Sequence, residues 1–128
     1  MKSLIILILL HIQISSFSQK LTFSDSVYNY ICQQGIKHPE IVMKQAILET
    51  GWFKGNFLMS RNNLFGFRKI EYLRFESWKK SVEYYKKWQD KRYTTKYKDY
   101  YDFLVKIKYA TPEYPSHLKK IAFSKKCK

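Results

Sequence analysis

Apolar side chains recur every three or four positions along most of the chain, which is the spacing of helices that bury one face. The first such segment has Ser24 or Asp25 as a candidate N-terminal cap and ends near Gly35. The second begins at Pro39, which suits the first turn of a helix, and stops at Gly51. The first part of the chain therefore predicts two consecutive helices.

Beyond the second helix the pattern changes twice. Residues 56–61 predict a short turn or helix, and the segments at 64–67 and 72–75 can pair around residues 68–71 as a β-hairpin. Helical spacing returns in three later segments, which are expected after Ser77, around residues 100–107 and at residues 116–123. The chain is predicted to be mainly α (α+β), with about five to six helices and one short β-hairpin.

The N-terminus has the pattern of an export signal. Lys2 precedes an apolar run at residues 4–14, and residues 16–18 form a small-x-small cleavage site. A membrane anchor is the alternative, but the run is shorter than the roughly 20 residues of a spanning helix. We therefore expect a signal peptide at residues 1–18, one domain at residues 19–128, and a secreted or periplasmic protein.

The composition is strongly basic, with 24 Lys and Arg against 10 Asp and Glu and a formal net charge of +14. Aromatic residues interleave with the cations in residues 78–109, a combination that often indicates a nucleic-acid partner. For an exported protein we expect no nucleic acid, and we predict attraction to anionic envelope polymers and lipid headgroups instead. The alternative is that most individual lysines only solvate the surface.

Cys32 and Cys127 are the only cysteines. An oxidising compartment would allow them to pair, and so long a loop could gain about 4 kcal/mol from the bond. Two free thiols are the open alternative, because Cys127 lies in a basic tail. The histidines that remain after the leader, His38 and His117, have no zinc spacing with these cysteines. No metal or cofactor is expected.

Glu49 is the candidate for acid chemistry. It falls in the last turn of the second predicted helix, and no other carboxylate lies between Glu40 and Glu71. Aromatic neighbours such as Trp52 and the negative end of the helix both disfavour its ionised form, so a raised pKa is expected. Such a carboxyl can act as a general acid toward a glycosidic oxygen. The alternative is an exposed glutamate at a fraying helix end.

Three motifs in order resemble the glucosaminidase family of peptidoglycan hydrolases. The family helix reads Gln-Ala-x-x-Glu-(Ser/Thr)-Gly-Trp and is followed by an Asn-x-Phe-Gly strand. The matching positions here are Gln45, Ala46, Glu49, Thr50, Gly51 and Trp52, then Asn62, Asn63, Leu64, Phe65 and Gly66. Residues 109–114 read YATPEY where the family usually has Tyr-Ala-Thr-Asp-Pro-x-Tyr, so the family Asp is missing. The resemblance covers nearly all of the chain after the leader.

The resemblance implies a lysozyme-like fold and hydrolysis of β-1,4 bonds after N-acetylglucosamine in peptidoglycan glycan strands. It places the catalytic acid at Glu49 and gives Tyr109 a hydrogen-bonding or transition-state-stabilising role, with a weaker prediction for Tyr114. A second carboxylate is less defined: Glu71 in the hairpin turn is a possible catalytic helper. If Glu71 cannot reach, the N-acetyl group of the substrate can serve as the nucleophile.

The residues predicted to contact sugar share these motifs, and they are Gln45, Trp52, Asn63, Phe65, Gly66 and Tyr114. Gly66 predicts either close backbone approach or a simple bulge. Asn62 and Asn63 are expected to have one structural and one functional role, without an assignment between them. A muramidase or lytic transglycosylase of the same fold is the related alternative. A non-catalytic envelope glycan-binding protein is the alternative from another class, and a monomer is expected in each case.

Overall fold

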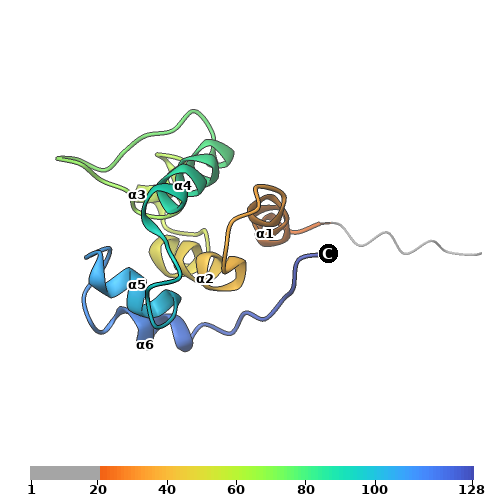
Figure 1. Ribbon diagram of the computed structural model, residues 1–128. Coiled ribbons are helices and arrows are strands. Elements are labelled where there is room, and N and C mark those ends of the chain that lie inside the picture. Colours follow the sequence, from red (N-terminus) through yellow and green to blue (C-terminus); the bar gives the residue numbers. More distant parts are fainter. Residues whose placement is uncertain (1–20) are drawn as a thin grey trace, which may run out of the picture.

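The computed structural model describes residues 21–128, and six helices carry the fold of this part of the chain (Figure 1). They are α1 (Phe23–Gln33), α2 (Pro39–Thr50), α3 (Asn56–Met59), α4 (Trp78–Arg92), α5 (Tyr100–Lys106) and α6 (Tyr114–Lys119). The predicted signal peptide lies outside the described residues. Helices with almost no strand structure confirm the predicted mainly α, lysozyme-like fold class.

Capping residues decide where the helices begin. The Thr22 side chain accepts a hydrogen bond from the Asp25 amide at 3.1 Å, and the Asp25 carboxylate accepts one from the Thr22 amide at 3.3 Å. This capping box starts α1 earlier than predicted, because Asp25 serves as its third helical residue and neither Asp25 nor Ser24 is the cap. Ser77 caps α4 as predicted, through the Lys80 amide.

Helix α2 lies in the middle of the fold. Figure 1 shows α1 to its right, α4 above it, α5 to its left and α6 to its lower left. The buried residues of α2 are Val42, Met43, Gln45, Ala46, Ile47 and Thr50. These positions occupy more than the single face that the sequence pattern predicted, because neighbours enclose the helix from several directions. The helix that carries Glu49 is therefore held firmly.

The predicted hairpin is a loop with one isolated bridge. Between α3 and α4, in what we call the α3–α4 loop (residues 60–77), the only pairing of strand type joins Arg68 to Tyr72. The buried Asn63 side chain holds the loop instead: its Nδ2 donates to the carbonyls of Phe67 and Leu73 at 2.8 and 3.0 Å, and its Oδ1 accepts from the Phe67 amide at 3.0 Å. A side-chain amide thus replaces most of a strand ladder.

The C-terminal segment returns to α1, as Figure 1 shows. A disulfide joins Cys32 to Cys127, the pairing that the sequence left open. The Tyr28 hydroxyl donates to the Lys125 carbonyl at 2.8 Å, and Lys125 forms an ion pair with Asp25. The chain end is therefore packed on α1.

Helix α6 begins two residues earlier than predicted. Its first turn contains Pro115, a position that tolerates proline because its missing amide proton has no helical partner there. The helix therefore includes Tyr114.

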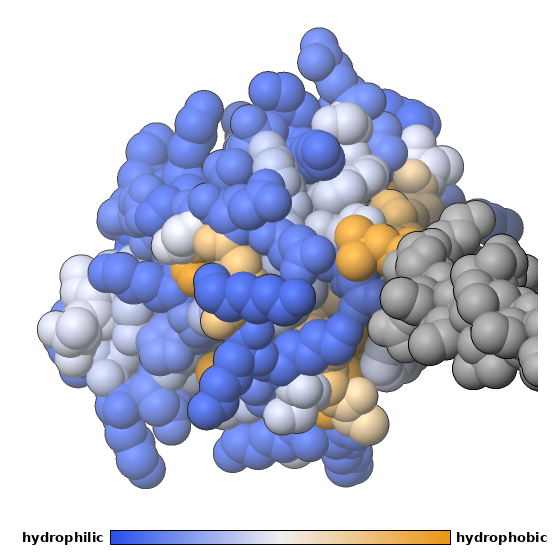
Figure 2. Space-filling model, turned by 90° about the vertical axis from the view of Figure 1, so that its right-hand side faces the viewer, coloured by the Kyte–Doolittle hydropathy of each residue, from blue (hydrophilic) through white to orange (hydrophobic). Residues whose placement is uncertain are grey.

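The interior is one aromatic-rich cluster, and the surface is largely hydrophilic. Side chains buried in the cluster come from helices and from the α3–α4 loop; they include Ile31, Met43, Phe65, Tyr85 and Phe103. The face with α1 and the C-terminal end is hydrophilic over most of its area, and apolar residues form small separate patches there (Figure 2). Within residues 21–128, none of the helices is long and apolar enough to cross a membrane.

Candidate active site around Glu49

Glu49 occupies the last turn of α2. Gly51 ends the helix with a φ of +57°, and Trp52 and Phe53 continue with φ values of +58° and +62°, so the chain turns sharply behind the carboxyl. The side chain is half-buried, and this burial raises the pKa of Glu49. The carboxyl also lies at the negative end of the helix, which disfavours an anion. Both effects favour the protonated acid that a general acid requires.

Tyr114 contacts Glu49 directly. Its hydroxyl donates to Glu49 Oε1 at 3.1 Å from the first turn of α6. This hydrogen bond favours the carboxylate and partly opposes the effect of burial on the pKa of Glu49. Burial and the neighbouring Glu49 raise the pKa of Tyr114, so its hydroxyl stays protonated and remains a donor. A residue 65 positions away in sequence therefore fixes one oxygen of the acid.

Gly66 faces the other oxygen of the same carboxyl. It adopts a φ of +68°, and a Cβ at this position would lie 3.0 Å from Glu49 Oε2 and 3.7 Å from Leu58 Cδ1. The close approach predicted for this glycine is therefore real, and the group that approaches is the carboxyl of Glu49. The carboxyl is enclosed between Tyr114 and the α3–α4 loop.

Tyr109 contacts neighbours of Glu49 and makes no hydrogen bond to Glu49 itself within the described residues. Its hydroxyl donates to the Phe65 carbonyl at 2.5 Å, and its ring packs against that of Tyr114 with centroids 5.7 Å apart. Burial raises the pKa of Tyr109 well above its usual value, so it also stays a donor. The sequence predicted a stronger catalytic role for Tyr109 than for Tyr114. In the structure it is Tyr114 that bonds to the carboxyl of Glu49, whereas Tyr109 bonds to the loop that carries Gly66.

A buried hydrogen-bond chain that the sequence pattern did not reveal links α4, α5 and α2. Gln89 Nε2 donates to the Tyr100 hydroxyl at 3.0 Å, the hydroxyls of Tyr100 and Tyr85 lie 2.5 Å apart, and Tyr85 donates to Gln45 Oε1 at 2.6 Å. Gln45 Nε2 has no hydrogen-bond partner among the described residues. The sequence feature that could have revealed this chain is a pair of glutamines, Gln45 and Gln89, in the otherwise apolar stripes of α2 and α4.

Three residues that were predicted to contact sugar lie in the interior of the protein. Gln45 and Asn63 have no exposed surface and Phe65 is 1% exposed. Gln45 bonds to Tyr85, Asn63 holds the α3–α4 loop together, and the Phe65 ring packs in the core. Asn63 therefore has the structural role, and Asn62 also bonds to the loop, at the carbonyl of Phe75. A functional role for Asn62 stays a prediction. Pattern alone could not separate an interior polar residue from one that faces a cleft.

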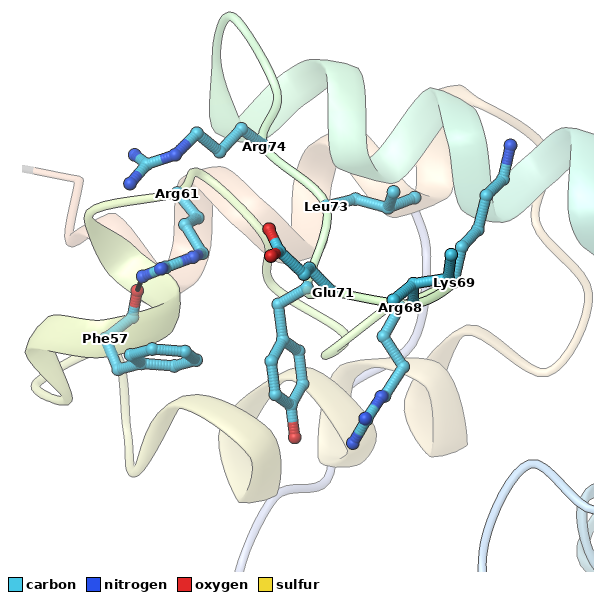
Figure 3. A pocket seen from close by; sticks show the side chains of 9 residues that line it. Phe57, Arg61, Arg68, Lys69, Glu71, Leu73 and Arg74 are labelled. Atoms are coloured by element: carbon cyan, nitrogen blue, oxygen red, sulfur yellow. Dashed lines mark hydrogen bonds between the residues drawn. The ribbon is translucent and has the colours of Figure 1, made fainter.

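Two other predicted residues remain exposed. Trp52 is 46% exposed beside the end of α2, a position that suits contact with a sugar ring. Glu71 is exposed in the α3–α4 loop, and Figure 3 shows its carboxylate pointing to the side where Arg61 and Arg74 lie. Within the described chain its carboxylate makes no hydrogen bond or ion pair. Its role as a catalytic helper stays a prediction.

Comparison with known families gives a match over most of the chain. A model of the glucosaminidase family, described as mannosyl-glycoprotein endo-beta-N-acetylglucosaminidase, matches residues 25–126, which include Glu49, Gly66, Tyr109 and Tyr114. Comparisons with curated proteins and with solved structures found no match.

Proposed function

This chain belongs to the glucosaminidase family, whose members are glycoside hydrolases acting on peptidoglycan or glycoprotein glycans, and from this premise we propose a specific reaction for it. The protein cleaves the β-1,4 bond after N-acetylglucosamine in peptidoglycan, and Glu49 is the general acid. The observation that carries this proposal is the half-buried Glu49 carboxyl with its raised pKa, held between Tyr114 and Gly66.

The two oxygens of Glu49 have different tasks in this proposal. Oε1 accepts the hydrogen bond from Tyr114, so the acidic proton resides on Oε2, on the side of Gly66. Oε2 donates this proton to the glycosidic oxygen as the bond to the anomeric carbon breaks. Tyr114 then stabilises the carboxylate that forms.

The nucleophile is proposed to come from the substrate. Glu71 has no contact that connects it to Glu49 within residues 21–128. The acetamido oxygen of the N-acetylglucosamine unit can attack its own anomeric carbon while the leaving oxygen takes the proton of Glu49. Water then opens the cyclic intermediate, and Glu49 takes back a proton. Only one protein carboxylate is needed for this sequence of steps.

Sugar binding and location complete the proposal. Trp52, which is exposed and follows the acid by three residues, offers an aromatic face for a sugar ring. Secretion or periplasmic location is proposed from the apolar run behind Lys2, and it would bring the enzyme to its polymer.

The test compares wild type with Glu49→Gln on purified peptidoglycan. The products are reduced with borohydride, and the new reducing ends are identified by mass spectrometry. Reduced N-acetylglucosamine from wild type and at least a 100-fold lower rate for Glu49→Gln, in the range of general acid catalysis, support the proposal. The matched control is Glu40→Gln, which changes an acid in the first turn of the same helix.

Other products would contradict the proposed bond. Reduced muramic acid or anhydro ends would identify the muramidase or transglycosylase alternative. Binding without any product from wild type would identify a non-catalytic glycan-binding protein.

A further inference from the structure

A hollow lies on the α3–α4 loop, outside the contacts of Glu49. It has a volume of about 890 Å³ and is open to the surface (Figure 3). Its lining comes from α3 and from the loop, and consists of Phe57, Arg61, Arg68, Lys69, Ile70, Glu71, Tyr72, Leu73 and Arg74. We call it the arginine hollow.

Arginine is concentrated in this hollow. The whole chain has four arginines against twenty lysines, and three of the four, Arg61, Arg68 and Arg74, line the hollow. With Lys69 and the single acid Glu71, the formal charge of the lining is 4 − 1 = +3. In each ion pair of the described residues the cation is a lysine, so these guanidinium groups have no carboxylate partner there.

Two of the guanidinium groups lie over aromatic rings, which hold them in position. Arg61 Cζ lies 3.9 Å from the centre of the Phe57 ring, and Arg61 Nη1 also donates to the Phe57 carbonyl at 3.2 Å. Arg68 Cζ lies 5.1 Å from the centre of the Tyr72 ring. The rings of Phe57 and Tyr72 pack edge to face with centroids 5.2 Å apart. Stacking reduces the conformational entropy that an arginine loses when it binds an anion.

The lining combines charge with exposed aromatic surface. Phe57 is 54% exposed and Tyr72 is 37% exposed. Aromatic faces suit the apolar faces of sugar rings, and the planar fork of arginine suits the two oxygens of a carboxylate or the oxygens of a phosphate. The hollow thus matches a sugar chain that carries an acidic group, and a neutral glycan would leave its arginines unused.

The chain connects the hollow to the acid over a short distance. Gly66, which contacts the Glu49 carboxyl, is only two residues before Arg68, so the backbone between them spans at most about 7 Å. On the α3 side, Leu58 lies next to Gly66 and follows directly after Phe57. A polymer cleaved at Glu49 would therefore place a neighbouring substituent at the hollow.

We propose that the arginine hollow binds an anionic substituent of the glycan strand, a carboxylate or a phosphate, next to the cleaved bond. This inference rests on the proposed function for the identity of the glycan. It makes the enzyme select acidic strands over neutral ones through Arg68 and Arg74, both exposed in the loop. Stem-peptide carboxylates and the phosphates of wall polymers attached to the strand are the two sources of this chemistry.

The test measures binding without cleavage. The full chain with Glu49→Gln is sedimented with insoluble peptidoglycan in three forms: untreated, freed of phosphate polymers with hydrofluoric acid, and freed of phosphate with its carboxylates also amidated. We expect at least one anionic form to bind about tenfold more tightly than the amidated form, and the replacement of Arg68 and Arg74 by Gln to abolish this preference. A preference that survives hydrofluoric acid identifies the carboxylate, and one that disappears with it identifies the phosphate.

Arg92→Gln is the matched control. Arg92 is the one arginine outside the hollow; it is exposed on α4 and lies 5.8 Å from the ring of Trp88, so it shares both the charge and the aromatic contact. It should keep the preference. The double change of Arg68 and Arg74 to Lys preserves charge and removes the guanidinium forks, and should lose most of the preference in a chain whose folding is checked by circular dichroism.

Three results would overturn the proposal. They are equal affinity of the unsubstituted chain for all three materials, a preference that persists in the Arg68→Gln and Arg74→Gln double variant, and an equal loss in Arg92→Gln. None of these depends on turnover, so failure of the hollow and failure of Glu49 as the acid are separate outcomes.

Discussion

Replacement of Gly66 by alanine tests the contact that encloses the acid. The new Cβ would lie 3.0 Å from Glu49 Oε2, whereas ordinary contact begins at 3.4 Å, so the carboxyl or the loop must move by about 3.4 − 3.0 = 0.4 Å. A misplacement of about 1 Å can cost roughly 100-fold in rate. A shift of 0.4 Å therefore predicts about a tenfold lower kcat/KM.

Backbone strain contributes separately to this variant. The φ of +68° at Gly66 costs an alanine roughly 1–2 kcal/mol in stability. Gly35 provides the matched control, because it has a φ of +66° and nothing within 4 Å of its Cβ position. Gly35→Ala should show a similar loss from backbone strain and retain the wild-type kcat/KM.

The assay combines the release of reducing ends from peptidoglycan with thermal unfolding by circular dichroism. Rates are taken well below the unfolding temperature of both variants. A kcat/KM for Gly66→Ala within twofold of that for Gly35→Ala would refute the reasoning, because the close contact would then have no part in placing Glu49. An equal fall in both variants would assign the effect to folding.

Three further predictions concern pH and redox state. Tyr114→Phe removes a hydrogen-bond donor to ionised Glu49 and should raise the pKa of Glu49 further. The alkaline limb of the kcat/KM profile, where Glu49 loses its proton, should therefore move to higher pH. Tyr109→Phe, which removes a donor to the Phe65 carbonyl, should leave this limb in place. Because burial raises the pKa of Glu49 in the folded state above its ordinary value of 4.5, the wild type loses stability as the pH rises from 4.5 through the folded pKa. Glu49→Gln should therefore be more stable than wild type in urea at pH 7, with a smaller difference below pH 4.5; an unchanged difference would contradict the burial argument. Reduction of the bond between Cys32 and Cys127 should lower the free energy of unfolding by about 4 kcal/mol, and an equal urea midpoint with and without dithiothreitol would disprove this.

The parts of the fold that depend on residues close together in the sequence were predictable from the sequence. Helix α2 was expected to begin at Pro39 and stop at Gly51, and it does, since proline and glycine act through their own backbone geometry. Ser77 was correctly placed as the cap of α4, because its side chain accepts a hydrogen bond from an amide only three residues away. The location of Glu49 in the last turn of α2 follows from these local rules.

Features that depend on distant contacts were not predictable in this way. The hairpin pattern was present, but Asn63 takes the hydrogen bonds that a second strand would have supplied. Tyr114 contacts Glu49 only because α6 packs against α2, and no local pattern distinguishes it from Tyr109. Gln45 shows the same limit: a polar residue on the face of the acid can point inward to a tyrosine as readily as outward to a ligand.

The bond joins Cys32 to Cys127 across a sequence separation of 95, so most of the folded chain forms a covalent ring. A protease that nicks this ring once, for example in the exposed turn at Ile70, would open it without releasing a fragment. The nicked molecule would still migrate as a single species on a non-reducing gel and separate into two only after reduction. The disulfide would therefore keep both parts of the domain joined after one cut.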